Sequence, residues 1–351
     1  MTVAAAVGNT TPQRTPEPEP IVPASFNATA MGGRFVIHLD VEWSGRQPVR
    51  GAGRHDGRAA ADNGADAAAD ARRDAHVVID RVHRWAERLT RHTETSDLSV
   101  LNSDPRSVIP VRPTLAAALL AAMVAADASE GFADVTLLDA RLAAEEGREH
   151  TGASRISEWQ ILRRHRGSGI VRRPPGLRFD LGGVGKGWIA DRALDLLSDW
   201  PSAVVDADGD LAVRTAAGRA WEVGVADPRS PDTHLTVLRL AAPAGGLPVR
   251  WGVATSGVSI HRWPSDGAAA EPARHHLIDP RTGRPAVTDV VQATVVAESA
   301  LRAEALAKSA VIAGSVDGFA LLERSRVRGA VLLTAKGDVL ALPVTLPLLD
   351  R

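Results

Sequence analysis

The side chains best suited to chemistry gather in a glycine-rich segment, residues 180–187 (DLGGVGKG). Its four glycines would let backbone N–H groups approach an anion closely, and the helix expected to follow adds the positive end of its dipole. Lys186 brings a full positive charge to the same place. The group suits a phosphate or pyrophosphate, although the spacing matches neither a P-loop nor the dinucleotide fingerprint. Taken alone, the segment is either an anion site or a structural turn.

Three other segments carry polar side chains beside turns. Residues 275–285 (HHLIDPRTGRP) contain a histidine pair, and histidine is a natural general base near neutral pH. Residues 254–257 (ATSG) place hydroxyl groups next to a glycine, and residues 131–136 (GFADVT) place Asp134 directly after an expected helix. Asp-Pro, Thr-Gly and similar pairs mark turns in most proteins. Each segment is therefore compatible with a ligand contact or with an ordinary turn.

Composition excludes several classes of protein. The chain has 351 residues, 44% of them hydrophobic and 24% charged, as in a globular protein of one large or two ordinary domains. The net charge of -1 gives no global positive field for nucleic acid or an anionic membrane. The lack of cysteine excludes a disulfide framework, a thiolate metal site and a cysteine nucleophile. The longest uncharged apolar run, residues 115–126, is shorter than the roughly 20 residues of a membrane span.

The elements that must position these candidates form an α+β chain with a substantial sheet. Residues 33–43 are typical of a strand. Two helices are predicted by apolar residues at helical spacing, which are Val78, Val82, Trp85 and Leu89 in the first and Leu115, Leu119, Met123 and Ala126 in the second. Residues 95–105, between them, predict a turn that carries Ser96 and Asn102.

The glycine-rich segment lies inside residues 177–197, which predict a strand, a turn and a helix. The second half of the chain predicts short strands separated by turns, interrupted by a helix over about 299–312. Residues 1–30 are expected to form a disordered proline-rich leader, and residues 44–75 a flexible insertion rich in Gly, Ala, Arg and Asp. The leader lacks the pattern of an export signal, which predicts a cytoplasmic protein.

Read in order, nine segments resemble the successive motifs of the ApbE family of FAD:protein FMN transferases. They are TAMGGRF, SDLSVLN, GFADVT, DLGGVGKGWIAD, DADGDL, WEVGVADP, ATSG, HHLIDPRTG and AEALAKSAVIAG, and they run from about residue 30 to residue 333. The resemblance implies one α+β, T-fold-like domain over residues 31–351, with mixed or antiparallel sheets and packed helices. It also implies transfer of FMN from FAD to a Ser or Thr hydroxyl of a redox protein in trans, with release of AMP. The family usually requires Mg²⁺.

The resemblance also implies roles for individual residues. His276 would be the general base that activates the acceptor hydroxyl, and Lys308 is a second catalytic candidate. Contacts to FAD would come from Met31, His92, Ala133, Asp134, Asp180, Lys186, Thr255, Ser256 and Asp279. The metal would lie at the backbone carbonyl of Gly183 and at Glu304.

Some positions depart from the family pattern. Glu304 and Lys308 stand where the family commonly has Asp and Thr as metal ligands, four residues apart on one helix face. A charged lysine has no lone pair and is a poor Mg²⁺ ligand. We hypothesise that the Lys308 ammonium replaces the metal; the alternative is an ordinary Glu–Lys helix pair. His92 stands where the family often has a flavin-stacking Tyr, and Asp208 where it favours a glycine.

Two other functions are compatible with the same motifs. The chain would bind FAD without transferring FMN if the altered pair, Glu304 and Lys308, had cost it activity. It would be an FAD pyrophosphatase, giving FMN and AMP, if water took the place of the acceptor hydroxyl. No nucleic acid partner and no integral membrane segment are expected.

Overall fold

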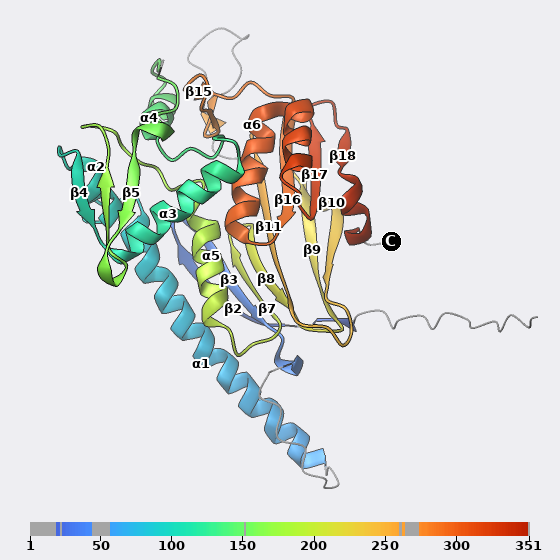
Figure 1. Cartoon of the computed structure of the whole chain (residues 1–351). Coiled ribbons are helices and arrows are strands. Elements are labelled where there is room, and N and C mark those ends of the chain that lie inside the picture. Colours follow the sequence, from blue (N-terminus) through green and yellow to red (C-terminus); the bar gives the residue numbers. More distant parts are fainter. Residues whose placement is uncertain are drawn as a thin grey trace, which may run out of the picture.

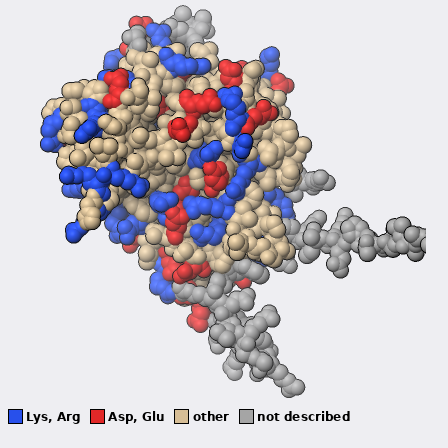
Figure 2. Space-filling model, viewed as in Figure 1, with Lys and Arg blue, Asp and Glu red and all other residues tan. Residues whose placement is uncertain are grey.

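The computed structural model describes residues 19–21, 23–43, 57–150, 152–259, 262–263 and 274–349. In this part of the chain a large sheet carries the long helices on one face and a smaller sheet against the other (Figure 1). Lys and Arg side chains are interspersed with Asp and Glu on the face seen in Figure 2. That mixture agrees with the near-zero net charge.

The large sheet has eight strands, and every neighbouring pair is antiparallel. From one edge to the other they are β18 (Val339–Ala341), β17 (Gly329–Thr334), β16 (Val290–Ala297), β11 (Val249–Gly257), β8 (Asp210–Thr215), β7 (Ala203–Ala207), β3 (Gly33–Leu39) and β2 (Ala24–Ala30). Successive side chains point to opposite faces of a strand. In β7, Val205 accordingly packs in the core under the helices, and Val204 packs in the core on the far face.

Three helices cover one face of this sheet, α1 (Gly57–Leu89), α5 (Gly185–Leu196) and α6 (Ala300–Arg324), and α3 (Pro113–Ala128) packs against these helices. Of the described helices, α6 alone is long and apolar enough to cross a membrane, and 56% of its apolar window is buried. It packs against β11, β16 and α5. This is the environment of a core helix.

Smaller elements complete the fold. The far face is covered by the sheet of β1 (Glu19–Pro20), β9 (Arg219–Asp227) and β10 (Ser230–Ala241). A second lobe combines β4 (Val108–Val111), β5 (Gln160–Arg163) and β6 (Gly169–Arg172) with α2 (Asp97–Ser103), whereas α4 (Leu138–Glu145) packs against the short strand pairs described next. Two short strand pairs, β12 (Arg262–Trp263) with β13 (Arg274–His275) and β14 (Ile278–Asp279) with β15 (Arg284–Pro285), lie before β16.

The structure confirms the α+β class and both amphipathic helices. Val78, Val82, Leu89, Leu115 and Leu119 are buried, whereas Met123 is 38% exposed. The predicted helix over 299–312 is the first part of α6, and the Ser299 side chain caps it by accepting from the N–H of Arg302. That helix continues beyond a break at Gly314.

Four expectations about local structure were wrong. Residues 24–30 are strand β2 and not part of a disordered leader, and residues 57–75 belong to α1 and not to a flexible insertion. The segment lacks large aliphatic residues, but alanine is the best helix former, and Ala71 and Ala75 pack in the core without bulk. Glu19–Pro20 also pair as a short strand, and residues 1–18, 22 and 44–56 of the leader and insertion lie outside the described residues.

The other two corrections concern short segments. Residues 97–103 form a helix rather than a turn, because Ser96 caps it by accepting from the N–H of Ser99 at 2.9 Å. Residues 177–181 are not a strand. Instead, the Asn102 side chain holds them by bonding both the N–H and the carbonyl of Phe179, each at 2.8 Å.

Candidate active site

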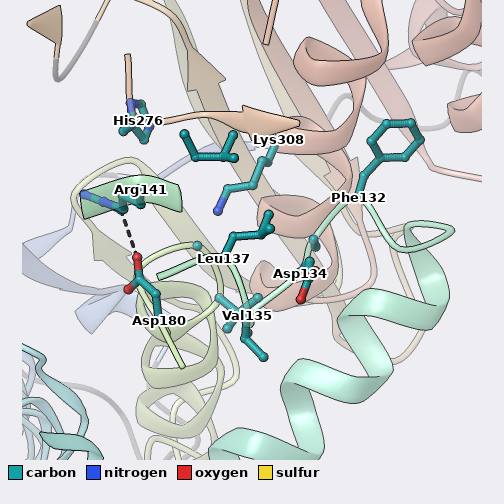
Figure 3. Close-up of a pocket in the computed structure, with 12 residues that line it drawn as sticks. Phe132, Asp134, Val135, Leu137, Arg141, Asp180, His276 and Lys308 are labelled. Carbon is teal, nitrogen blue, oxygen red and sulfur yellow. Dashed lines mark hydrogen bonds and ion pairs between the residues drawn. The ribbon is translucent and has the colours of Figure 1, made fainter. Parts of the chain in front are cut away.

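Segments far apart in the sequence meet at one cavity beside the start of α5 (Figure 3). Its lining comes from the loop before α4, from α4 itself, from the glycine-rich turn, from the segment after β13 and from α6. The lining residues are Phe132, Ala133, Asp134, Val135, Leu137, Arg141, Asp180, Gly183, Val184, His276, Ile278 and Lys308. The volume of about 40 Å³ is room for a few water molecules. The cavity therefore fits one small charged group, not a whole flavin.

Backbone and side-chain contacts fix the position of the glycine-rich turn. The N–H of Asp180 donates to the carbonyl of Val135 at 2.8 Å, which joins the turn to the loop before α4. Buried Asp191 of α5 accepts from the first N–H groups of α6, from Ala300 at 3.1 Å and from Leu301 at 3.0 Å. Because a carboxylate at a helix N-terminus is favourable, this cap holds α5 and α6 together.

The glycines of the turn make room for side chains. A Cβ on Gly183 would coincide with Nζ of Lys308, and a Cβ on Gly187 would lie 2.8 Å from Oε2 of Glu304. A Cβ on Gly185 would lie 3.1 Å from Cε of Met31. The turn is thus shaped around three of the side chains that the sequence singled out.

Most of the backbone N–H groups expected to bind an anion already donate to acceptors within the protein. Val184 and Gly185 donate to the carbonyl of Leu181, and Gly182 donates to the Asp180 carboxylate at 2.8 Å. The N–H of Gly187, in the first turn of α5, donates to Glu304 at 2.9 Å. The positive charge that faces the cavity therefore comes from side chains and not from these four donors.

Arg141 of α4 supplies part of that charge. Its Nη1 lies 3.3 Å from the Asp180 carboxylate, and its Nε lies 3.3 Å from Glu145. Figure 3 shows Arg141, Lys308 and His276 approaching the same space from three elements. The sequence analysis missed Arg141; a single basic residue in a short alanine-rich helix directly after GFADVT was the available signal.

Behind the turn lies a buried cluster of charges. Nζ of Lys186 is 3.3 Å from Asp208 and 3.9 Å from Asp210, while Glu304 stands between the two lysines. Asp208 has φ +60°, the conformation that favours the glycine expected there, and Gly33 opposite it leaves space for its carboxylate. The cluster is thus accommodated by the local backbone.

Burial dominates the titration of this cluster. It raises the pKa of Asp210 well above its usual range, with a further contribution from Glu304, and it raises the pKa of Glu304 against the opposing charges of Lys308 and Lys186. Burial lowers the pKa of Lys308, which Glu304 and Asp180 offset only in part. Burial also acts to lower the pKa of Lys186, but Asp210, Glu304 and Asp208 outweigh it, so the net shift is upward. Asp210 and Glu304 therefore bind a proton more readily than exposed carboxyl groups do.

The cavity brings together six of the predicted site residues: Ala133, Asp134, Asp180, Gly183, His276 and Lys308. Met31, Lys186 and Glu304 pack around the turn behind it. The Asp134 carboxylate also accepts from the N–H of Thr136 at 2.7 Å and from its hydroxyl at 2.8 Å. Its carboxylate therefore shapes the loop.

The remaining predicted residues do not line this cavity. His92 is exposed between α1 and α2, and Ser256 is half-buried in β11. Thr255 bonds Thr294 across the sheet at 2.8 Å and lines a different cavity on the far face. Asp279 follows the lining residue Ile278, but its carboxylate is held by Arg281 at 2.8 Å.

The residues at Gly183 and Glu304 do not fit a divalent cation. Lys308 Nζ fills the space beside Gly183, and Glu304 is bonded to the N–H of Gly187. Among the residues that the structure describes, no group of three or more His, Asp or Glu side chains could hold a metal ion. Mg²⁺ is a hard cation that prefers several oxygen ligands in octahedral geometry, which this arrangement does not offer.

Comparison with known proteins places this site in a family. The model of the ApbE family matches residues 59–332. The chain belongs to the ApbE family. Its curated relatives include the FAD:protein FMN transferase of Treponema pallidum, 34% identical over 160 residues, and that of Vibrio cholerae, 28% identical over 176 residues. These matches cover 42% and 49% of this chain and 41% and 49% of the relatives, so the chain spans about half the length of the curated relatives it matches.

Solved ApbE structures share the fold over nearly all of the chain. The ApbE protein of Thermotoga maritima superposes with a TM-score of 0.71 at 21% identity, covering 94% of this chain and 100% of its own. The apo flavinyl transferase ApbE of Pseudomonas stutzeri superposes with a TM-score of 0.68 at 18% identity, covering 94% and 98%. The predicted single α+β architecture is therefore confirmed for this member of the ApbE family.

Proposed function

We propose that this chain transfers FMN from FAD to a serine or threonine hydroxyl of a target protein and releases AMP. The observation that carries the proposal is the convergence of His276, Arg141 and Lys308 on one cavity in a member of the ApbE family. A base and two cations are what a phosphoryl-type transfer from a pyrophosphate needs. Relatives with the name FAD:protein FMN transferase support the same reaction.

The proposed reaction uses these side chains in separate roles. The FAD pyrophosphate lies at the cavity, where Lys308 and Arg141 neutralise its charge. The imidazole of His276 accepts the proton of the acceptor hydroxyl, and the hydroxyl oxygen forms a bond to the FMN-side phosphorus. The bond from that phosphorus to the bridging oxygen breaks, and AMP leaves with the electron pair. Charge that develops on the phosphoryl oxygens falls next to the two cations.

The rest of the ligand lies outside the small cavity. We propose that Met31 contributes its soft thioether to the flavin ring, since its Cε already lies against the glycine-rich turn. Because the residues present do not fit Mg²⁺, no step of this mechanism runs through a metal ion. Action in trans on a redox protein, and in the cytoplasm, stays a prediction from the sequence.

The test replaces the imidazole of His276 with a neutral, polar amide that cannot accept the proton. The purified chain is incubated with FAD and a flavinylation acceptor domain carrying an exposed Ser/Thr motif, and acceptor mass, AMP and free FMN are measured. Wild type should add one FMN per acceptor and release AMP in equal amount. His276→Gln should slow transfer by about 10²–10⁴-fold, the typical contribution of a general base, and keep FAD binding.

His234→Gln is the matched control, because His234 is exposed on β10 of the other sheet. FMN and AMP appearing with no change of acceptor mass would identify an FAD pyrophosphatase instead. Bound FAD with neither product across several acceptor domains would identify a flavin-binding protein and overturn the proposal.

A further inference from the structure

The ammonium of Lys308 occupies the position beside the glycine-rich turn at which a cation would meet the pyrophosphate. We propose that this ammonium, placed beside Gly183 by α6, is a built-in cation that replaces a divalent metal ion, so that the site neither binds nor needs Mg²⁺. The catalytic part of this inference rests on the function proposed above. The metal-binding part stands on the geometry alone.

Space at Gly183 is the first observation. A Cβ there would coincide with Lys308 Nζ, so the turn accepts this side chain only because residue 183 is glycine. Figure 3 shows the Lys308 amino group reaching the middle of the cavity, between Arg141 and the loop that carries Asp134. A cation held at this point by a covalent tether leaves no room for a second one.

The carboxylates around Lys308 are the second observation. Glu304, one helical turn before Lys308, accepts from the N–H of Gly187 at 2.9 Å, and its negative charge acts to raise the pKa of Lys308 against the effect of burial. Asp180 bonds the N–H of Gly182 at 2.8 Å and pairs with Arg141. Asp210 faces Lys186. Each acidic group near the ammonium already has a partner inside the protein, which leaves few free oxygen ligands for a metal ion.

The choice of lysine is the third observation. The chain has 41 basic residues besides histidine, and only three of them are lysines, at positions 186, 308 and 336. Two of the three lie in this one cluster. A compact ammonium fits beside Gly183, whereas a planar guanidinium is larger and donates in a fixed fork. The local shape thus favours lysine in a chain that otherwise uses arginine.

Charge balance is consistent with the replacement. Lys308 and Arg141 together bring two positive charges to the cavity, the same number as one divalent ion. A pyrophosphate beside Nζ adds negative charge and favours the protonated form of Lys308. The two cations would therefore act most strongly when the substrate is bound.

Mn²⁺ titration tests the metal-binding part directly, because free Mn²⁺ gives a six-line electron paramagnetic resonance signal that weakens on binding. Wild-type protein without FAD should leave this signal unchanged. With FAD present, the signal should be the same as that of Mn²⁺ and FAD without protein. Lys308→Thr removes the ammonium and supplies an oxygen ligand next to Glu304, so it should bind Mn²⁺ at least about tenfold more tightly than wild type. Lys336→Thr, on the surface, is the control.

AMP release in EDTA tests the catalytic part. Wild type should turn over equally in EDTA and in Mg²⁺, while the rate of Lys308→Thr should fall by about 10²-fold in EDTA and recover in part in Mg²⁺.

Stoichiometric Mn²⁺ binding by wild type, displaced by Mg²⁺, would overturn the inference without any variant. Transfer by wild type that stops in EDTA would also overturn it and leave the proposed function standing. No transfer in any condition, with no Mn²⁺ bound, would overturn the proposed function and retain the built-in cation.

Discussion

Two cavities on opposite faces of the eight-stranded sheet are built in opposite ways. The cavity between this sheet and β9 measures about 500 Å³ and is lined mainly by apolar side chains such as Val204, Trp221 and Val253. The candidate active site measures about 40 Å³ and is lined by charged and titratable groups, including Arg141 and Lys308. The larger space has His38, Asp206 and Glu222 among its mainly apolar lining, and the smaller one has an imidazole and two basic side chains.

The difference lies in how polar groups are used. In the far cavity Thr255 bonds Thr294 at 2.8 Å, and His38 bonds Ser25, which lies outside the lining, at 2.8 Å. In the candidate site Arg141 pairs with Asp180 at 3.3 Å, and the Lys308 amino group reaches into the space. Charged side chains that face a cavity therefore identify the candidate site better than the volume of the cavity does.

The largest expected effect on FMN transfer comes from filling the space beside Gly183. Gly183→Ala places a methyl group where Lys308 Nζ lies, so the ammonium must move away from the pyrophosphate. We expect FMN transfer to fall by about 10²-fold, the range seen when one electrostatic donor is lost. Steady-state AMP release with an acceptor domain measures it.

Gly185→Ala is the matched control on the same turn. Its methyl group would lie 3.1 Å from the flexible end of Met31 and 3.7 Å from Cβ of Leu181; the Met31 end can shift slightly and still reach a flavin ring, and none of these contacts involves Lys308. Transfer should stay within a few-fold of wild type. Equal losses in the two variants would mean that the turn is sensitive as a backbone and that Lys308 has no special position.

The next effect concerns the cap that sets α5 against α6. Asp191→Ala removes the acceptor for the N–H groups of Ala300 and Leu301 and a partner of Arg250 at 3.0 Å. We expect a loss of about 2–3 kcal/mol in the free energy of unfolding, from a lost cap and unpaired buried donors. Urea unfolding followed by circular dichroism measures it. Asp195→Ala, which removes the more exposed partner of the same arginine, should cost only about 0.5 kcal/mol.

A smaller effect appears in the pH dependence of stability. Since burial and Glu304 raise the pKa of Asp210 in the folded chain, the native state keeps a proton that the unfolded state releases above about pH 4. This contribution is complete below that pH and is lost as pH rises through the folded pKa. Asp210→Asn should therefore make the free energy of unfolding fall less steeply with rising pH.

Denaturant titrations at several pH values from 4 upward measure that slope. Part of it should remain, because burial raises the pKa of Glu304 as well. Asp208→Asn, at the exposed end of the same turn, is the control and should leave the slope close to that of wild type. An unchanged slope in Asp210→Asn would mean that the buried cluster does not take up the proton.

Much of the fold was readable from the sequence because it rests on local pattern. The helix with Leu115 and Leu119 and the alternating strands of the second half appear where the periodicity predicted them. Residues 57–75 were misread because alanine contributes helix propensity without the bulk that marks an apolar face. Such a segment becomes predictable only when its packing partner is known.

The sequence predicted site residues only where they lie in recognisable motifs. His276 and Asp180 line the cavity, while their roles stay predictions, and the glycines of the turn have a different use from the predicted anion cradle. They accommodate Lys308 and Glu304 from a helix more than 100 positions away in the chain, which no local pattern reveals. Arg141 was missed for the same cause, since only tertiary structure brings it to Asp180.

The smallest effect, and the one that sharpens the comparison most, is expected at Thr255. Thr255 and Ser256 are predicted to contact FAD, yet alternation along β11 sends Ala254 toward the helices and Thr255 toward the far cavity. Thr255→Val removes one hydrogen bond to Thr294 and should cost about 0.5–1 kcal/mol of unfolding free energy. FAD affinity, measured by flavin fluorescence, should stay within about twofold of wild type. A loss of tenfold or more would mean that part of the ligand reaches the far face, in which case the two cavities serve one substrate and the separation drawn between them is wrong.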